Sequence, residues 1–201
     1  LGRLGQAEPR RDGLHGELPG LQRVHADSNP DTGVSNFLSA PPMRGKRQLL
    51  SKEDTQKVLY QGTSGVLAVS GDDDYPYAVP LSYVYDGHKI YFHSAKAGHK
   101  LDSIVKNPKA SFCVIDKDQI VPDEYTTYFR SVIVFGTIRI LHDEEGKREA
   151  IKKLAVKYAP DDTEENRNKA IENGIRYVYV LEMTPEHISG KEAIELVRQH
   201  K

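Results

Sequence analysis

The chain has 201 residues, of which 38% are hydrophobic and 28% charged, a composition typical of a globular domain with a buried core. Its 28 basic and 29 acidic side chains give a formal charge of −1, so the basic excess needed for non-specific nucleic-acid binding is missing. No apolar run approaches the roughly 18 residues of a membrane-spanning helix. The sequence therefore predicts neither a nucleic-acid partner nor a membrane partner. The single cysteine, Cys113, excludes an internal disulfide framework and suits a reducing compartment, so we expect a cytoplasmic protein.

Residues 1–42 differ in composition from the rest of the chain. They contain 6 Gly and 5 Pro but no Ile, Lys or Tyr, and no apolar periodicity runs through them. Such a stretch cannot bury enough apolar surface to offset the entropy lost on ordering. We therefore expect residues 1–42 to be a disordered tail, or an upstream or cloning-derived extension before a natural start at Met43. Residues 43–201 are expected to form one folded domain.

From Met43 onward, short strands and short helices follow one another. The pattern from Ser51 to Asp54 resembles a capping box, and Gly62 marks the end of the helix that it predicts. Strands are predicted next at 65–70 and 77–85, and Asp86-Gly87 signals a two-residue hairpin that leads into a third strand. The remaining predictions are the third strand at 89–94, a helix at 98–106, strands at 110–115 and 131–141, helices at 144–158 and 162–173, and strands at 177–183 and 187–191.

Six or seven strands with short helices between them predict a mainly β domain with helical insertions (α+β), folded as a small β-barrel. The length of the 131–141 strand predicts a central position in the sheet. The strands do not alternate with long helices, which disfavours a parallel doubly wound sheet. The sequence contains no G-x-G-x-x-G after a strand, no P-loop, no H-E-x-x-H and no G-x-S-x-G motif.

The segment from His93 to Leu101 carries the clearest chemical signal. A strand ends in His93-Ser94, the chain turns through small residues, and a helix begins near Gly98. Free N–H groups at a helix start can bind an anion, to which Ser94 adds a hydroxyl and His99 and Lys100 add charge. The segment therefore predicts a phosphate cradle, and the alternative is a solvated basic turn.

Two further segments contain candidate binding residues. Pro80 lacks the backbone N–H that a strand residue normally donates, and it lies in the predicted strand that contains Val79, Leu81 and Ser82. This indicates an edge strand or a bulge. Locally unpaired backbone there can bond the edge of a flat heteroaromatic ring; the alternative is an edge proline that opposes aggregation. The aromatic stretch 125–131, with Arg130 near its end, is interpreted as a ligand lip, a dimer contact or ordinary packing at the end of the barrel.

Taken together, these segments resemble the Nim-type 5-nitroimidazole resistance proteins, which belong to the pyridoxamine 5′-phosphate oxidase-like, flavin-binding split barrels. The resemblance covers about residues 43–190 and is most specific in the Phe-His-Ser-Ala-Lys-x-Gly block that starts at Phe92. It also includes Tyr75-Pro-Tyr-Ala-Val-Pro-Leu81 and the stretch from Phe129 to Gly136.

The resemblance implies an FMN-binding split β-barrel, assembled as a homodimer with FMN in two interface clefts. Val79, Pro80, Leu81 and Ser82 would lie along the flavin ring. The phosphate would be surrounded by His93, Ser94, His99 and Lys100, while Tyr128, Arg130 and Ser131 would approach from the other chain. His99 stands where many relatives have Arg, and a neutral His would weaken the phosphate contact.

The function implied is that of an FMN-dependent oxidoreductase acting on a small aromatic or nitro-aromatic substrate, with the redox chemistry supplied by the cofactor. Only His93 is a catalytic candidate, and it could equally be a hydrogen-bonded core histidine. No metal site is predicted. One alternative is a non-catalytic flavin- or haem-binding split barrel with His93 or His99 as an axial ligand. Another is a dimeric structural module whose cleft has lost its ligand.

Overall fold

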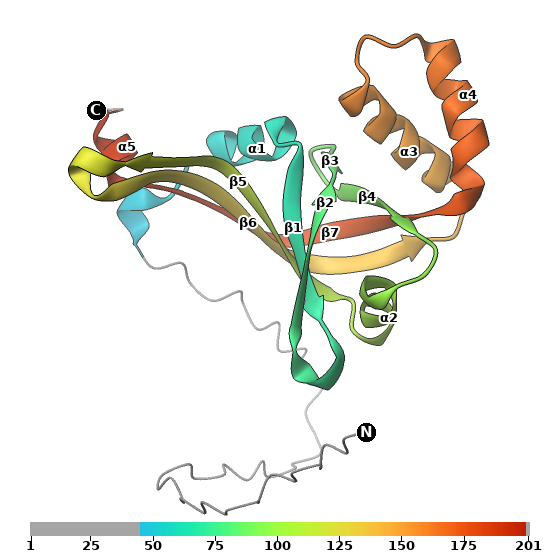
Figure 1. Cartoon of the computed structure of the whole chain (residues 1–201), viewed down its shortest axis with the longest axis horizontal. Coiled ribbons are helices and arrows are strands. Elements are labelled where there is room, and N and C mark those ends of the chain that lie inside the picture. The colour runs from blue at the N-terminus through green and yellow to red at the C-terminus, as the bar shows by residue number, and fades with distance from the viewer. Residues whose placement is uncertain (1–44, 200–201) are drawn as a thin grey trace, which may run out of the picture. The chain divides into compact units, whose positions relative to one another are not determined.

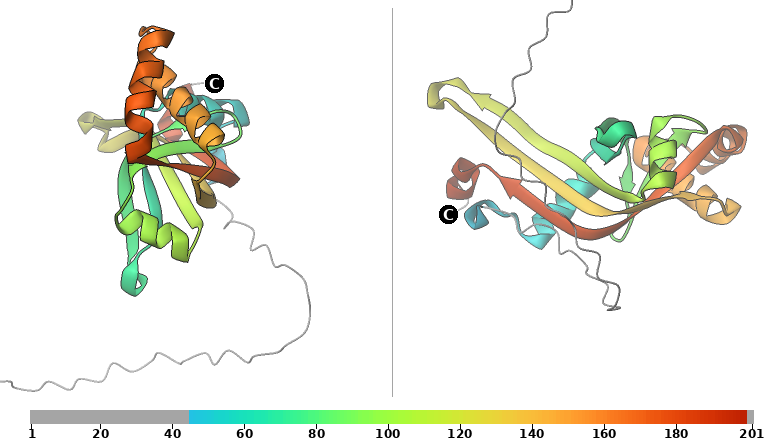
Figure 2. Two further views of the ribbon diagram at one scale, coloured as in Figure 1. Left: turned by 90° about the vertical axis from the view of Figure 1, so that its right-hand side faces the viewer. Right: turned by 90° about the horizontal axis from the view of Figure 1, so that it is seen from below.

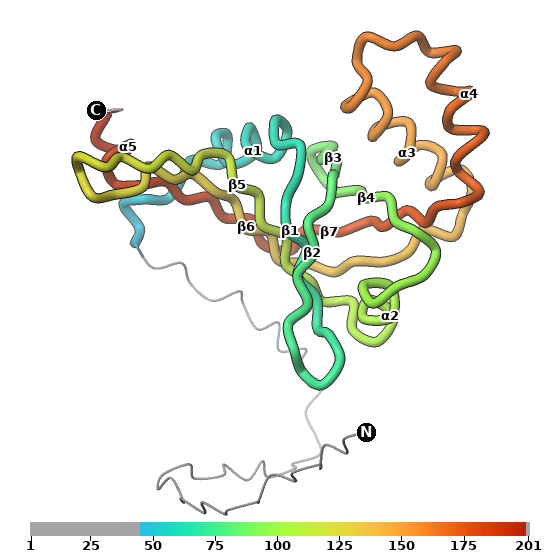
Figure 3. The backbone as a smooth tube through the Cα atoms, viewed as in Figure 1, coloured from blue at the N-terminus to red at the C-terminus, as the bar shows by residue number. Residues whose placement is uncertain are grey.

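The computed structural model describes residues 45–199, and the expectation for residues 1–42 lies outside this range (Figures 1 and 3). Within it, helices flank one curved antiparallel sheet. The strands are Ser64–Ser70 (β1), Pro76–Ser82 (β2), Val84–Tyr85 (β3), Ile90–Ala95 (β4), Lys109–Val121 (β5), Thr126–Leu141 (β6) and Val178–Glu192 (β7). The helices are Lys52–Gln61 (α1), His99–Lys106 (α2), Glu144–Tyr158 (α3), Glu164–Gly174 (α4) and Ile194–Gln199 (α5).

The seven strands of the described range pair in the order β2-β1-β5-β6-β7-β4-β3. β6 therefore has three strands on each side, and the predicted central position of the 131–141 strand is confirmed. The sheet curls until β2 and β4 approach each other, but these described strands form no ladder between the two edges. This is the architecture of a split β-barrel: the strand and helix pattern predicted a small barrel, and the family resemblance implied its split form.

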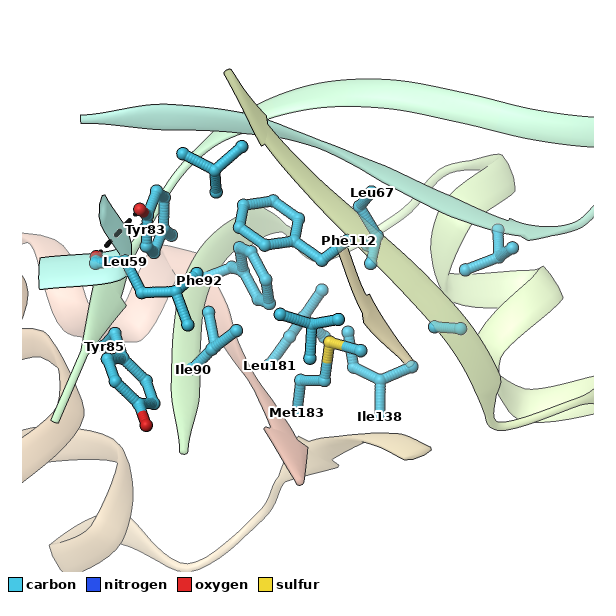
Figure 4. Packing of buried hydrophobic residues seen from close by; sticks show 14 of the residues in the cluster. Leu59, Leu67, Tyr83, Tyr85, Ile90, Phe92, Phe112, Ile138, Leu181 and Met183 are labelled. Carbon is cyan, nitrogen blue, oxygen red and sulfur yellow. Dashed lines mark hydrogen bonds between the residues drawn. The ribbon is translucent and has the colours of Figure 1, made fainter. Parts of the chain in front are cut away.

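The barrel core is built from alternating side chains of the strands (Figure 4). Phe112 of β5 is fully buried and meets two other rings edge-on, Phe92 of β4 at 5.0 Å and Tyr83 at 4.9 Å between centroids. The Tyr83 hydroxyl donates to the Leu59 carbonyl of α1 at 2.8 Å, so α1 is fixed to this core by both packing and a hydrogen bond. Burying such aromatic side chains is a major source of stability.

Outside the barrel, α3 covers the other face of β4 and β7 (Figure 2). Its cap is Asp143, whose carboxylate accepts from the Gly146 N–H at 2.6 Å, and Thr163 caps α4 by accepting from the Asn166 N–H at 3.2 Å. Both helices match their predicted positions. Ala150 and Leu154 of α3 bury their side chains in a second, smaller cluster with residues of the sheet, which are Val84, Tyr91, Leu141 and Val180.

Several sequence predictions are wrong in detail. β5 and β6 run on through polar residues into a long two-stranded arm, seen extending from the barrel in Figure 1. The strands predicted at 177–183 and 187–191 are one strand, β7, and α5 was not predicted. The predicted strand 77–85 is broken at Tyr83. The hairpin after β3 spans four residues, with Asp86 accepting from the His88 and Lys89 N–H groups.

The continuity of β7 depends on a bulge opposite Gly136. The β6–β7 register shifts between Phe135 and Gly136, where Gly136 faces Pro185 and Phe135 faces His187. A Cβ atom at Gly136 would lie 2.1 Å from the Thr184 carbonyl oxygen, so only glycine allows the strands to approach this closely. Pro185, which lies between the two predicted strands, therefore marks a bulge in one continuous strand.

None of the helices in the described range 45–199 is long and apolar enough to cross a membrane.

Candidate functional site

β2 forms one edge of the sheet, as Pro80 predicts. Pro80 faces Val66 in the β1 register, and Val79 and Leu81 on either side of it turn inward to pack on the barrel core. Pro80 and Ser82 are exposed on the opposite face of the strand. One backbone edge of β2 is therefore open to a ligand, while its inward side chains hold the strand in place.

His93 and Ser94 point to opposite faces of β4. Ser94 is 4% exposed and shares the barrel face with Phe92, and its Oγ donates to the Ala95 carbonyl at 3.0 Å. His93 lies on the α3–α4 side of the sheet and is exposed. The two residues were predicted to surround one phosphate, but the structure places only Ser94 on the barrel side.

The start of α2 lies beside β2. Gly98 precedes the helix with φ of +133°, and a Cβ built there would meet nothing within 4 Å. No side chain caps this helix, so its first N–H groups are available to solvent or to an anion. The His99 ring lies 5.8 Å from the ring of Tyr77 in β2, which joins the two elements.

Asp72, in the turn between β1 and β2, contacts two nearby basic side chains. It accepts from Lys106 Nζ at 2.6 Å, and His99 Nδ1 lies 3.3 Å from its other oxygen. The Lys106 ammonium holds the pKa of the Asp72 carboxyl below its usual value, with a smaller effect from His99. By contrast, Lys100 forms no ion pair with any residue between 45 and 199. Lys100 is thus a cation of this corner that remains available to an anionic ligand.

A cavity of about 410 Å³ lies between the α3–α4 pair and the sheet. Ser82 and His93 form its polar side, together with Tyr158. The remaining lining residues are Ile151, Leu154, Ala155, Ala170, Ile171, Gly174, Ile175 and Val178. Ser82 therefore belongs both to the edge strand β2 and to the wall of this cavity, so the two parts of the site adjoin.

The three candidates on β6 lie far from His93 within one chain. Leu181 of β7 pairs with both Phe92 of β4 and Ile140 of β6, so Ile140 marks the level of the site along the sheet. Arg130 is ten residues earlier in β6, which corresponds to roughly 30 Å of strand. A single chain cannot bring Arg130 and His93 to one ligand.

Each of these β6 candidates has local contacts. Arg130 donates to the buried Glu192 at 2.9 Å, and its other nitrogen lies 3.3 Å from Asp116. The Tyr128 hydroxyl donates to Glu124 at 2.9 Å. Ser131 pairs with both neighbouring strands, opposite Ile115 and Lys191 in the register. Arg130 is therefore oriented by two carboxylates before any ligand arrives.

Sequence reasoning missed Asp72, Tyr77 and Tyr158 as parts of this region. Asp72 sits in a run of three aspartates that indicates a polar turn, and no local pattern shows that it binds His99 and Lys106. The helical spacing of Tyr158 indicates only that it faces inward. Their roles depend on contacts between residues far apart in the sequence, which local patterns do not report.

Comparison with known proteins agrees with this architecture. The family described as pyridoxamine 5′-phosphate oxidase matches residues 51–192 of this chain. An uncharacterized protein of Rhizobium meliloti is 32% identical over 99 residues, which are 49% of this chain and 60% of that protein. The chain thus matches less than two thirds of the length of that curated relative.

Two crystal structures share the fold. A candidate 5-nitroimidazole antibiotic resistance protein from Bacteroides thetaiotaomicron superposes with a TM-score of 0.61 at 20% identity, covering 72% of this chain and 86% of that one. A FAD-binding protein from Mesorhizobium loti has a TM-score of 0.51 at 26% identity, covering 73% of this chain and 97% of that one.

Proposed function

Because this chain belongs to the pyridoxamine 5′-phosphate oxidase family, we propose that it binds FMN and transfers electrons through it to a small flat substrate. The similar protein from Mesorhizobium loti binds a flavin, and the Bacteroides protein is described as an antibiotic resistance protein for 5-nitroimidazoles, which are flat nitro-aromatic rings. These relatives support the class of cofactor and the class of substrate.

The observation that carries the proposal is the adjacency of an open strand edge and an uncapped helix start. The Tyr77–His99 contact brings β2 to the first turn of α2, where Lys100 has no carboxylate partner among the described residues. An FMN molecule needs a flat polar edge for its ring and a cationic pocket for its phosphate, and this corner offers both. The residues present therefore fit the cofactor.

In this proposal Lys100 and the N–H groups at the start of α2 bind the phosphate. Backbone groups along Val79–Ser82 hold the ring and stabilise negative charge that develops on it. Bound FMN supplies the hydride or electron transfer. His93, in the cavity that adjoins Ser82, can donate a hydrogen bond or a proton to a substrate atom.

We also propose that the functional unit is a homodimer. Tyr128, Arg130 and Ser131 can act at the same ligand as His93 only if they come from a second copy, because about 30 Å of β6 separates Arg130 from the level of His93. The arm that carries them also exposes large apolar side chains, with Ile115 62% and Ile120 74% exposed. Exposed apolar surface of this kind is typical of protein interfaces.

Titration of the purified protein with FMN, followed by quenching of the flavin fluorescence, tests the proposal. We expect Lys100→Ala to weaken FMN binding about tenfold or more, since a charge-assisted phosphate contact is lost. Lys109→Ala, which removes an exposed lysine just after α2, is the matched control and should leave the affinity unchanged. If the wild-type protein neither retains FMN nor quenches its fluorescence, the proposal is wrong.

Turnover separates the oxidoreductase from a non-catalytic flavin protein. With a chemical reductant and a nitro-aromatic probe such as 4-nitrobenzyl alcohol, the FMN-loaded protein should accelerate loss of the nitro-group absorbance over free FMN. Tight FMN binding with no acceleration would favour the non-catalytic alternative.

A further inference from the structure

The cavity beneath α3 and α4 has an apolar wall formed by two helices. Four lining residues come from α3 and lie three, four and seven positions after the first, so they share one face of the helix: Ile151, Leu154, Ala155 and Tyr158. Ala170, Ile171 and Ile175 come from the end of α4 and the turn after it. The apolar faces of α3 and α4 therefore line the side of the cavity that lies opposite the sheet.

The basic residues of α3 lie away from this cavity. Lys153 Nζ is 2.5 Å from Asp86 and lies over the Tyr91 ring at 4.7 Å, while Lys157 donates to the Gly62 carbonyl at 2.5 Å. Both line a separate groove on the other side of the helix. In the described part of the chain, no lysine or arginine lines the α3–α4 cavity.

Few polar side chains line the cavity: Ser82, His93 and Tyr158. Tyr158 uses its hydroxyl on backbone groups of Thr63 and Tyr83, so it offers mainly its ring. The His93 imidazole makes no hydrogen bond with any residue of the described range, and the Ser82 side chain also lines the cavity. A ligand in the cavity would thus meet one imidazole, one hydroxyl and a wall that is otherwise mostly hydrocarbon.

Resting on the proposed function, we infer that this cavity binds the substrate and that the substrate is an uncharged, largely apolar ring compound, not a phosphate ester. A volume of about 410 Å³ lies within the range of sites for small molecules. Transfer of a phosphate dianion to a mostly apolar wall without a cation is strongly unfavourable, whereas a neutral ring loses little on desolvation. The α3–α4 insertion would then determine specificity, although the family is named for oxidation of a phosphorylated substrate.

The test uses two probes that share the nitrobenzyl ring and differ by a phosphate group, 4-nitrobenzyl alcohol and 4-nitrobenzyl phosphate. Equilibrium dialysis of the FMN-loaded protein without reductant measures their binding directly, from the absorbance of the nitro ring. We expect the alcohol to bind at least about tenfold more tightly than the phosphate ester.

Two variants fill the cavity from different helices, Ala155→Phe on α3 and Ala170→Phe on α4. Each should weaken binding of the alcohol about tenfold or more, because the added ring occupies the ligand volume. Asn168→Phe adds the same ring to an exposed position of α4 that does not line the cavity, and it should leave binding unchanged. Ala170 is itself exposed, so its variant is expected to fold even if Ala155→Phe does not.

The inference is overturned if the phosphate ester binds as tightly as the alcohol, or if the folded cavity-filling variants bind the alcohol like the wild type. Flavin absorbance of each sample reports the proposed function separately. Protein that retains FMN but shows no cavity-dependent binding refutes this inference alone. Protein that binds the alcohol with the expected preference but retains no FMN refutes the proposed function and supports the cavity site.

Discussion

The phenol oxygen of Tyr158 makes the hydrogen bonds with the backbone of Tyr83 that a neighbouring strand would otherwise make. It accepts from the Tyr83 N–H at 2.8 Å and lies 2.9 Å from the Tyr83 carbonyl oxygen, to which it can donate. Tyr83 is the residue at which the chain passes from β2, on one edge of the sheet, to β3 on the other. The last residue of α3 therefore satisfies the backbone at the split of the barrel, next to Ser82 of the proposed site.

Removal of this hydroxyl should destabilise the fold. We expect Tyr158→Phe to lower the free energy of unfolding by about 1–3 kcal/mol, because the Tyr83 N–H loses its acceptor. Urea unfolding measures the change. Tyr60→Phe is the control, since the Tyr60 ring packs 5.0 Å from Tyr85 but its hydroxyl makes no hydrogen bond within the described residues. Equal stability of the two variants would contradict the role given to Tyr158.

A buried carboxylate predicts how stability depends on pH. Glu182 is 5% exposed; burial raises its pKa, but hydrogen bonds from Lys89 and Arg139, each at 2.8 Å, outweigh burial and hold the pKa below the usual value of 4.5. Because the folded pKa is the lower one, ionised Glu182 stabilises the fold above pH 4.5, and this stabilisation is lost as the pH falls further.

Glu182→Gln should therefore lower the free energy of unfolding by about 1–3 kcal/mol at pH 7. The difference in free energy of unfolding between variant and wild type should narrow as the pH falls below 4.5, since the wild-type carboxylate is then protonated and becomes neutral, as the glutamine is. Unfolding curves at pH 7, 5 and 3.5 measure this difference. A gap that stays constant, or grows, at low pH would show that the Glu182 charge does not stabilise the fold.

The β7 bulge opposite Gly136 gives a steric prediction with an internal control. Gly136→Ala should destabilise the protein by about 1–3 kcal/mol, because the new methyl group would overlap the Thr184 carbonyl. Gly174→Ala, at the last residue of α4 with nothing within 4 Å, should be neutral or stabilising by up to about 1 kcal/mol. Thermal unfolding of both variants checks the contrast, and a Gly136 variant as stable as the wild type would rule out the close approach.

The exposed arm tests the proposed dimer. The wild-type protein should have twice the mass of one chain in light scattering, and the double variant Ile115→Asp, Ile120→Asp should shift toward single chains and retain less FMN. Two charges placed on an apolar interface oppose association. Asn168→Asp, exposed on α4, should change neither quantity. Single-chain mass for a wild-type protein that is saturated with FMN would contradict the dimer proposal.

Local signals predicted most of the fold. The helices α1, α3 and α4 begin at Ser51, Asp143 and Thr163, whose side chains cap them, and the apolar alternation of the barrel strands shows in the sequence. The break at Tyr83 could not be predicted, because its cause is a hydrogen bond to a residue 75 positions away. The long arm was not predicted, because its polar strands are stabilised by backbone pairing between β5 and β6 and not by burial of apolar side chains.

The candidate site was only partly predictable for the same reason. The sequence indicates an edge strand at Pro80 and a helix start at Gly98, and both are found there. The opposite orientations of His93 and Ser94 follow from side-chain alternation in the strand predicted at 89–94. The sequence gives no sign, however, that α3 and α4 enclose a cavity over His93, because the docking of these helices depends on the whole fold.

A crystal structure of the protein grown with excess FMN tests the central claim most directly. We predict that the phosphate lies within about 3 Å of Lys100 Nζ or of the first N–H groups of α2, with the ring along Val79–Ser82. A complex in which the nucleotide occupies another crevice, and leaves the junction of β4 and α2 empty, would contradict the account even with the barrel intact.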